Sequence, residues 1–212
     1  MKDGESSMQD IYKLIFLSVI ISFLGFVTEN LWLLVTKGYM DNRNMILPFL
    51  SGYGILVVGF YLLFGTPTEM HVDLPGNRLS DLELFFILTF FTVSLGEIVL
   101  GMFAEKILGI IYWDYSWIPL HFTRYTSLPT SIGFTCIIVL FMKHCFTPIM
   151  DSLSLLPESV LGPVAGIMFV IICLDTLHSF WMMHASHSLY CLWRIDLPHI
   201  TADLPLNLFK IT

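Results

Sequence analysis

The sequence predicts an all-α integral membrane protein with about five transmembrane helices, four of which form a parallel two-helix internal repeat. Composition is the first observation. Of 212 residues, 56% are hydrophobic and 13% are charged, and the mean hydropathy is +0.77, whereas soluble domains carry about a quarter charged residues. The second observation is five apolar runs of the roughly 20 residues that a helix needs to cross a bilayer. These runs are continuous rather than alternating, which favours helices over barrel strands.

The first part of the chain is a polar N-terminus, residues 1–10, followed by a first two-helix repeat, residues 11–64. Within that repeat we expect spans at 11–36 and 45–64. The first apolar run is longer than the core of a signal peptide, so we expect no cleavage.

The middle of the chain contains an acidic loop, residues 65–83, and then a second two-helix repeat, residues 84–147. Proline, glycine and acidic residues make the loop water-exposed. The predicted spans of the second repeat are 84–112 and about 126–147.

The last part comprises a loop and a fifth span, residues 148–183, with the span itself at 159–183. The tail, residues 184–212, is too polar to span and is expected to be interfacial or exposed. Five spans put the termini on opposite faces, and lysine and arginine placement weakly favours a cytoplasmic face opposite the N-terminus. We expect an integral protein of the plasma membrane.

Two motifs of the first repeat return in the second, which indicates a duplication. The first motif is Leu24-Gly25-x-x-x-Glu29, which returns as Leu100-Gly101-x-x-x-Glu105. The second is Arg43-x-x-x-Leu47-Pro48-x-x-x-Gly52, which returns as Arg124-x-x-x-Leu128-Pro129-x-x-x-Gly133. The interval from glutamate to arginine is 14 residues in the first copy and 19 in the second. Because each copy contains two spans, both enter the membrane in the same direction, as in a parallel repeat.

Each copy places an acid near the end of a helix and an arginine soon after it. An unpaired acid at the centre of a membrane helix costs about 2.5–3.5 kcal/mol on insertion scales. Pairing of glutamate with arginine, within a copy or across copies, would satisfy both charges. The glycine four residues before each glutamate shares its helix face and lets another segment approach closely.

Other charged residues extend this pattern. Glu97 lies eight residues before Glu105, so it either reaches water or a basic partner, or joins an acidic cavity between the repeats. Asp114 can cap a turn or pair with an arginine. Asp175 and His178 share a face of the fifth span, either as a structural contact or as a proton-accepting pair. The candidate substrate- or ion-binding residues are Glu29, Arg43, Glu97, Glu105, Asp114, Arg124, Asp175 and His178.

Several classes of protein are disfavoured. The net charge of −7 leaves no basic patch for nucleic acid. The four cysteines show no CxxC pair, and we expect small core residues rather than a disulfide framework. There is no compact cluster of metal ligands, so we expect no metal and no cofactor.

These motifs resemble the ABC-transporter type IV family, also called CmpB-like. The residues that carry the resemblance are Thr28-Glu29-Asn30-Leu31-Trp32, Asn42-Arg43-Asn44, Pro48, Gly52-Tyr53-Gly54, Glu97, Glu105 and Trp113-Asp114-Tyr115-Ser116. The likeness covers about residues 20–180. The chain departs from the family pattern at Asn44, where the family has glycine, and lacks the family's Gly-Pro before the Tyr-Gly element.

The resemblance implies a transporter or permease-like component for a small polar substrate or ion. The sequence contains no G-x-x-x-x-G-K-[ST] motif, so any ATP hydrolysis requires a separate ATPase, and a partner membrane subunit is a further option. Membrane lipids are the other expected partners. Two alternatives stay open: an intramembrane enzyme acting on a lipid-linked substrate through Asp175, His178 and His121, and a non-catalytic accessory membrane subunit.

Overall fold

The computed structural model describes residues 2–72 and 79–197, and these are mostly helical. The α-helices are α1 Lys2–Lys37, α2 Ser51–Phe64, α3 Asp81–Phe103, α4 Leu128–His144, α5 Phe146–Ser154 and α6 Glu158–Ser186. A π-helical turn, Ala104–Leu108, continues α3. Such turns are rare and often occur at functional sites.

Three short antiparallel strand pairs join the loops. Strand β1 (Tyr39–Asp41) pairs with β6 (Arg194–Asp196), so the loop after α1 is joined to the C-terminal tail. The other pairs are β2 (Gly65–Thr66) with β3 (Glu69–Met70), and β4 (His121–Thr123) with β5 (Thr126–Ser127).

The described chain contains three helices that are long and apolar enough to cross a membrane, and up to four if one bent pair counts as a single span. The three are Met8–Lys37, Asp81–Leu108 and Glu158–Ser186. The bent pair is α4 with α5. Helix α2 has 14 residues, about 21 Å at about 1.5 Å per residue, against a hydrocarbon core of about 30 Å. An integral membrane protein is therefore supported, and the predicted count of five spans is not confirmed.

The second predicted span begins later than expected. Residues 45–50 form no helix, and α2 begins at Ser51. Arg43 and Asn44 have positive φ angles of 47° and 63°, and Pro48 disfavours the helical conformation for Leu47. The segment Asn42–Leu50 is therefore an ordered loop that leads into a short helix.

The segment expected as a loop after the fourth span is partly helical. Helix α5 forms there, and its axis is bent by 43° from that of α4. The proline ring of Pro148 would clash with the carbonyl of His144 in a continuous helix. The chain therefore bends at Cys145 instead of ending its helix.

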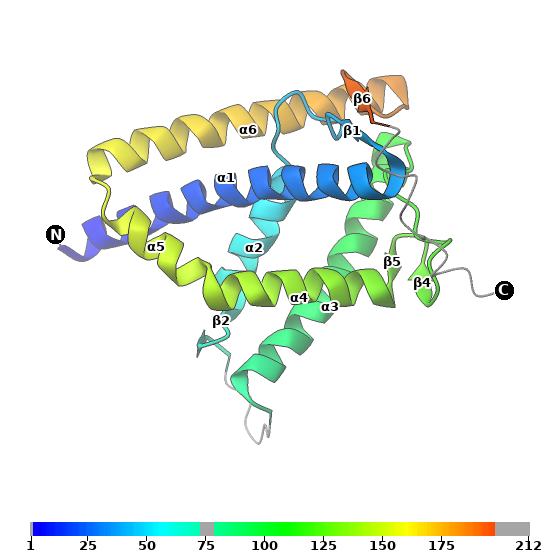
Figure 1. Ribbon diagram of the computed structural model, residues 1–212. Helices are drawn as coiled ribbons and strands as arrows, with labels where there is room; N and C mark the ends of the chain where they lie inside the picture. The colour runs from blue at the N-terminus through cyan, green and yellow to red at the C-terminus, as the bar shows by residue number, and fades with distance from the viewer. Residues whose placement is uncertain (1, 73–78, 198–212) are drawn as a thin grey trace.

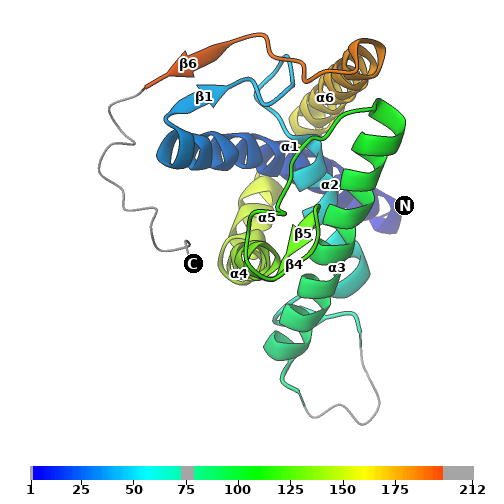
Figure 2. The ribbon, with the colours of Figure 1, turned by 90° about the vertical axis from the view of Figure 1, so that its right-hand side faces the viewer.

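Helices α1 to α5 share one core, and a second, smaller cluster packs the π-helical turn against α6. Helix α1 packs against α2 and α6, and α3 packs against α4 (Figure 1). The buried core residues come from both halves of the chain and are Leu17, Ile21, Val57, Phe60, Phe85, Val93, Ile138, Val139, Met142 and Phe146. The ends of α1, α3 and α6 and the start of α4 lie at the same end of the molecule (Figure 1). Figure 2 looks onto this end, where β4 and β5 lie between α3 and α4.

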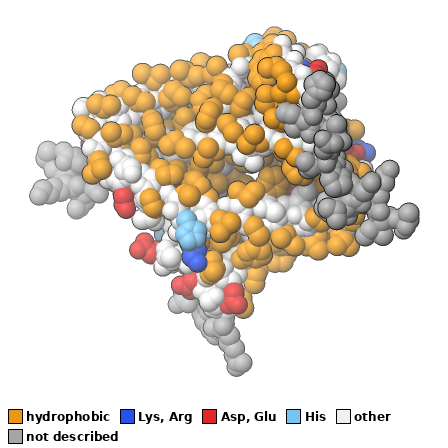
Figure 3. Space-filling model, in the orientation of Figure 1, with side chains coloured by type: hydrophobic (Ala, Val, Ile, Leu, Met, Phe, Trp, Pro, Cys, Tyr) orange, Lys and Arg blue, Asp and Glu red, His pale blue; other side chains and the backbone are white. Residues whose placement is uncertain are grey.

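The outside of the helices is apolar. Hydrophobic side chains cover most of the face seen in Figure 3, as expected of a surface in contact with lipid. The prediction that the cysteines are core residues is wrong: Cys136, Cys145 and Cys191 are exposed and Cys173 is half-buried, all as free thiols. Cys136 lies on the exposed side of α4, where a small apolar side chain fits lipid as well as a core.

Candidate functional site

The first charged assembly consists of Glu29, Arg43 and Tyr53. Arg43 Nε donates to Glu29 Oε2 at 2.7 Å, and Arg43 Nη2 also forms an ion pair with that oxygen. The hydroxyl of Tyr53 donates to Glu29 Oε1 at 2.8 Å. Both carboxylate oxygens of this acid, which lies near the end of an apolar helix, are thus satisfied.

The loop after β1 holds Arg43 in place. The backbone nitrogen of Arg43 donates to Asp41 Oδ1 at 2.8 Å, and the backbone carbonyl of Arg43 accepts from the Tyr112 hydroxyl at 3.0 Å. Burial alone would lower the pKa of the Arg43 guanidinium, but the adjacent Glu29 carboxylate raises that pKa above its ordinary value. Burial and the same carboxylate raise the pKa of Tyr112 to about 12.

The second charged assembly consists of Glu105, Arg124 and Tyr125. Arg124 Nη1 lies 3.2 Å from Glu105 Oε1 and 3.3 Å from Oε2, and the Tyr125 hydroxyl donates to Oε2. Asp114 Oδ2 lies 3.9 Å from Arg124 Nη2. The Arg124 side chain is 42% exposed, against 18% for Arg43. The second assembly is therefore the more open one, and each arginine pairs with the glutamate that precedes it in its motif.

A glycine makes room for the tyrosine in both assemblies. A Cβ atom on Gly25 would lie 2.6 Å from Cγ of Tyr53, and one on Gly101 would lie 2.6 Å from Cγ of Tyr125. The ring crosses the helix at the glycine, and its hydroxyl meets the glutamate one turn further on. The Gly-x-x-x-Glu spacing thus places the gap for the tyrosine ring one helical turn before the carboxylate that accepts the hydrogen bond of its hydroxyl.

The Trp113–Ser116 segment folds against the second assembly. Trp113 Nε1 donates to the Tyr125 carbonyl at 2.8 Å, and the Tyr115 nitrogen donates to the Arg124 carbonyl at 2.7 Å. Asp114 Oδ1 accepts from the Ser116 nitrogen at 2.8 Å. Hydrogen bonds from Ser116, together with the charge of Arg124, lower the pKa of Asp114. Asp114 therefore both caps a turn and faces an arginine.

Tyr115 is within electrostatic reach of acids from both helix pairs. Burial raises the pKa of its phenol above the ordinary value, and the carboxylates of Glu97 and Glu29 raise it further. One aromatic side chain thus connects the first charged assembly electrostatically with the third span.

Glu97 belongs to a separate group that we call the hydroxyl ring, formed with Thr126 and Ser131. Glu97 Oε2 lies 2.6 Å from Thr126 Oγ1 and 3.2 Å from Ser131 Oγ, and the two hydroxyls are 2.9 Å apart. Glu97 Oε1 is buried and has no hydrogen-bond partner among the described residues. Within the described part of the chain, this acid is held by hydroxyl groups and not by a basic side chain.

Asp175 and His178 are not brought together as a pair. Asp175 is buried and accepts from the backbone nitrogens of Ile46 at 2.9 Å and Leu47 at 3.1 Å. His178 is exposed, and its ring packs against Trp181 and Tyr190. Asp175 therefore holds the loop before α2, and His178 lies outside the charged assemblies.

A family model described as "Putative ABC-transporter type IV" matches residues 15–180. The chain belongs to this family. The match includes both charged assemblies and the hydroxyl ring, and it confirms the resemblance drawn from the motifs. The searches of curated proteins and of solved structures found no match. Family and apolar helices together fit an integral membrane protein related to transport.

Residues that complete the site of this type IV protein were missed from sequence. Tyr53, Tyr115, Tyr125, Thr126 and Ser131 supply the hydroxyl groups around the acids. A signal existed for two of them, because Tyr53 and Tyr115 lie in the motifs that resemble the family. The other three lie around the start of α4, Tyr125 and Thr126 before it and Ser131 in its first turn, in a stretch without a motif spacing of its own.

Asn42 of this type IV protein does more than make a turn. Its Nδ2 donates to the carbonyls of Met45 at 2.7 Å and Tyr190 at 2.9 Å, and its Oδ1 accepts from the Leu192 nitrogen at 3.0 Å. This buried amide therefore ties the Arg43 loop to the C-terminal tail. A cavity of about 180 Å³ beside it is lined by Phe26, Asn42, Ile46, Leu47, Pro48 and Trp193.

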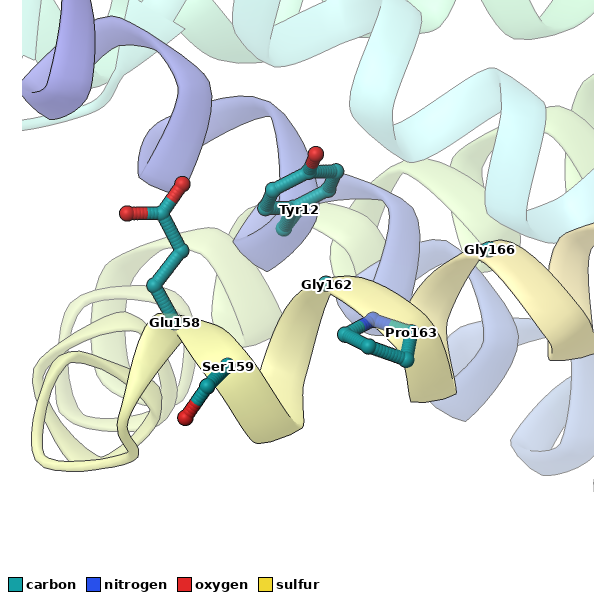
Figure 4. A pocket seen from close by; sticks show the side chains of 6 residues that line it. All are labelled: Tyr12, Glu158, Ser159, Gly162, Pro163 and Gly166. Atoms are coloured by element: carbon teal, nitrogen blue, oxygen red, sulfur yellow. The ribbon is translucent and has the colours of Figure 1, made fainter.

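The remaining polar features lie elsewhere. An open hollow of about 570 Å³ between α1 and α6, at the end opposite the charged assemblies, is lined by Tyr12, Glu158, Ser159, Gly162, Pro163 and Gly166 (Figure 4). Within residues 2–72 and 79–197, no three His, Cys, Asp or Glu side chains are grouped so as to hold a metal.

Proposed function

We propose that the protein is a transporter or permease-like component that moves a small polar solute or ion across the membrane. The observation that carries the proposal is the presence of two Glu–Arg–Tyr assemblies, one in each helix pair, at the same end of the molecule. Charged side chains within membrane proteins are costly and commonly mark the path of a substrate or ion.

The chemistry of the assemblies suits a polar ligand. Removing one partner of a buried ion pair leaves an uncompensated charge and is strongly destabilising. A solute that carries both a positive and a negative group could replace both partners at once, so opening the pair would leave no bare charge. The open second assembly would receive such a solute first, because Arg124 and Glu105 are more exposed than Arg43 and Glu29.

We also propose that the two helix pairs are copies of one unit, so that α2 and the bent α4–α5 pair count as spans and the total is five. Positions that correspond in the sequence motifs support this. Leu17 and Val93 correspond, as do Val57 and Ile138, and all four lie in the same core. Tyr53 packs against its counterpart Phe134, with ring centroids 6.4 Å apart. Equivalent residues meet each other when a symmetry axis passes between them.

The family description points to ABC systems, and we propose a separate ATPase or a second membrane subunit as the protein partner, in the plasma membrane. Co-purification of the full chain from its native membrane, followed by mass spectrometry, tests this. A stoichiometric ATPase or second membrane subunit is the expected result, and a chain that purifies without any such partner contradicts it.

Transport is tested with the purified chain in liposomes. The probes are a radiolabelled amino-acid mixture, inorganic phosphate and radiolabelled rubidium, each offered separately. Uptake should occur for at least one probe, and Glu29→Gln or Glu105→Gln should abolish it. Glu69→Gln, at an exposed position of β3, is the matched control and should transport normally. Uptake that survives both substitutions in folded protein excludes the proposed site.

A non-catalytic accessory subunit is the second candidate, because each assembly already satisfies its own charges. A buried ion pair can serve specificity rather than transport. In that case no probe is taken up, and Glu29→Gln lowers thermal stability or partner binding instead. The enzyme alternative has less support, since Asp175 binds loop amides and His178 lies apart from it.

A further inference from the structure

The hydroxyl ring of Glu97, Thr126 and Ser131 differs from the charged assemblies because no basic side chain takes part. None of the ion pairs among the described residues involves Glu97. The ring brings together α3, β5 and the first turn of α4, and Thr126 and Ser131 are fully buried. An ionised carboxylate in such a place is costly unless it is paired.

Counting hydrogens identifies the protonation state that fits this geometry. Three oxygens make three mutual contacts, of 2.6, 2.9 and 3.2 Å. Each contact needs one hydrogen, and the two hydroxyls supply only two. A third hydrogen on Glu97 Oε2 closes the ring, because each oxygen then donates once and accepts once: Glu97 to Thr126, Thr126 to Ser131, and Ser131 to Glu97.

We propose that Glu97 is an exchangeable proton-binding site, and that proton movement through it accompanies transport. On release, the proton leaves Oε2 for water or a basic group of the solute, and the carboxylate keeps the two hydroxyl donors. The coupling to transport rests on the proposed function, whereas the proton-binding site itself does not. The buried Oε1, which has no partner among the described residues, is the atom left for a water or solute group to approach.

The surroundings link this proton to the first charged assembly. The loop before β4 contributes the Tyr115 phenol, which lies within electrostatic reach of Glu97, Glu29 and Arg43. From α2, the Tyr53 phenol is in turn within reach of Tyr115, whereas α4 presents the Ser131 hydroxyl. Loss of the proton adds a negative charge near Tyr115 and therefore acts on the Glu29–Arg43 pair.

Infrared spectroscopy of the reconstituted protein tests the proton site without any transport assay. Near neutral pH, the carbonyl stretch of a protonated carboxyl group is expected. It should disappear in Glu97→Gln and persist in Glu105→Gln, the matched acid on the same span. Thr126→Val and Ser131→Ala keep the acid and should shift the band. A native protein without the band overturns the proposal, and so does a band that appears only when sodium is removed, since the ligand is then a metal cation.

A transport measurement separates this inference from the proposed function. With the probe that is taken up, uptake should rise when a proton gradient is imposed, and Glu97→Gln should remove that response. Uptake that ignores the gradient overturns proton coupling while transport itself stands. If Glu97 is protonated but the protein takes up no probe, the proton-binding site is supported and the proposed transport function is contradicted.

Discussion

Two glycines determine where the charged assemblies can form. Gly25 and Gly101 leave the space through which the rings of Tyr53 and Tyr125 reach the glutamate one turn away. In each case the glycine determines where the tyrosine can make its hydrogen bond to the glutamate. The glycine is therefore as necessary to the assembly as the charged residues.

Gly25→Ala should lower the stability of the protein. The added Cβ would lie 2.6 Å from Tyr53 Cγ, and overpacking of this kind costs about 1–3 kcal/mol. Thermal unfolding in detergent measures the loss. Gly59→Ala is the control, because nothing lies within 4 Å of its Cβ and alanine stabilises a helix interior by about 0.5–1 kcal/mol. Equal effects of the two substitutions would show that the Tyr53 ring does not depend on the gap.

The two arginines should differ in energetic weight. Arg43→Gln leaves Glu29 half-buried without a cation, and breaking a buried pair costs about 3–5 kcal/mol. Arg124→Gln affects a more exposed pair, 42% against 18% by side-chain exposure, and an exposed ion pair contributes little to stability. Denaturant unfolding of both variants in the same detergent provides the comparison. A larger loss for Arg124→Gln would contradict the ranking.

At the scale of elements, α6 supports the loop that precedes α2. That loop takes the place of the expected first turns of the helix, so its backbone nitrogens need acceptors from outside. Asp175 supplies them for Ile46 and Leu47. A long helix therefore positions a short one through a single carboxylate.

Asp175→Ala should release this loop. The backbone amide groups of Ile46 and Leu47, whose hydrogen bonds are part-buried, would lose their acceptor, at a cost of up to about 1–3 kcal/mol for each group that stays unsatisfied. Hydrogen exchange followed by mass spectrometry should show faster exchange in the peptide that contains Ile46 and Leu47. Leu177→Ala on the same helix is the control, because that side chain is 67% exposed. Unchanged exchange in Asp175→Ala would mean that other contacts hold the loop.

Sequence reasoning reached the helical membrane class and both glutamate–arginine pairs, because apolar length and charge in an apolar run are local signals. It missed the late start of α2 and the bend at Cys145, where loop conformation and Pro148 decide the outcome. It also missed the role of Asp175. That residue bonds to amides 128 and 129 residues away, a contact with no signature in the chain.

For the whole molecule, all of the charged assemblies lie at one end, and the β2–β3 hairpin lies at the other (Figure 1). Whether the short α2 crosses the membrane decides the topology. If it does, the hairpin and the loop Asn42–Leu50 face opposite sides of the bilayer. The bilayer would have to thin locally around α2, or the flanking loops would have to extend the span.

Cysteine labelling tests this arrangement. In a chain whose four cysteines are replaced, Glu69→Cys and Ser116→Cys should react with a membrane-impermeant maleimide from opposite sides of sealed vesicles. Ser7→Cys should react from the same side as Glu69→Cys, because an even number of crossings separates them. Labelling of Ser7→Cys and Glu69→Cys from opposite sides would contradict a spanning α2, and labelling of Glu69→Cys and Ser116→Cys from one side would contradict a spanning α3.

The buried amide of Asn42 has a consequence for how the protein is made. Its partner Leu192 follows it by 150 residues, and translation at about 5–20 residues per second needs about 8–30 s to cover that distance. During this time the first two helices enter the membrane without the strand that later pairs with β1. The Arg43 loop therefore forms its last hydrogen bonds only at the end of synthesis. In a chain stalled on the ribosome before Leu192, Asn42 would still lack its bond from the Leu192 nitrogen, and the first charged assembly would not yet be tied to the C-terminal tail.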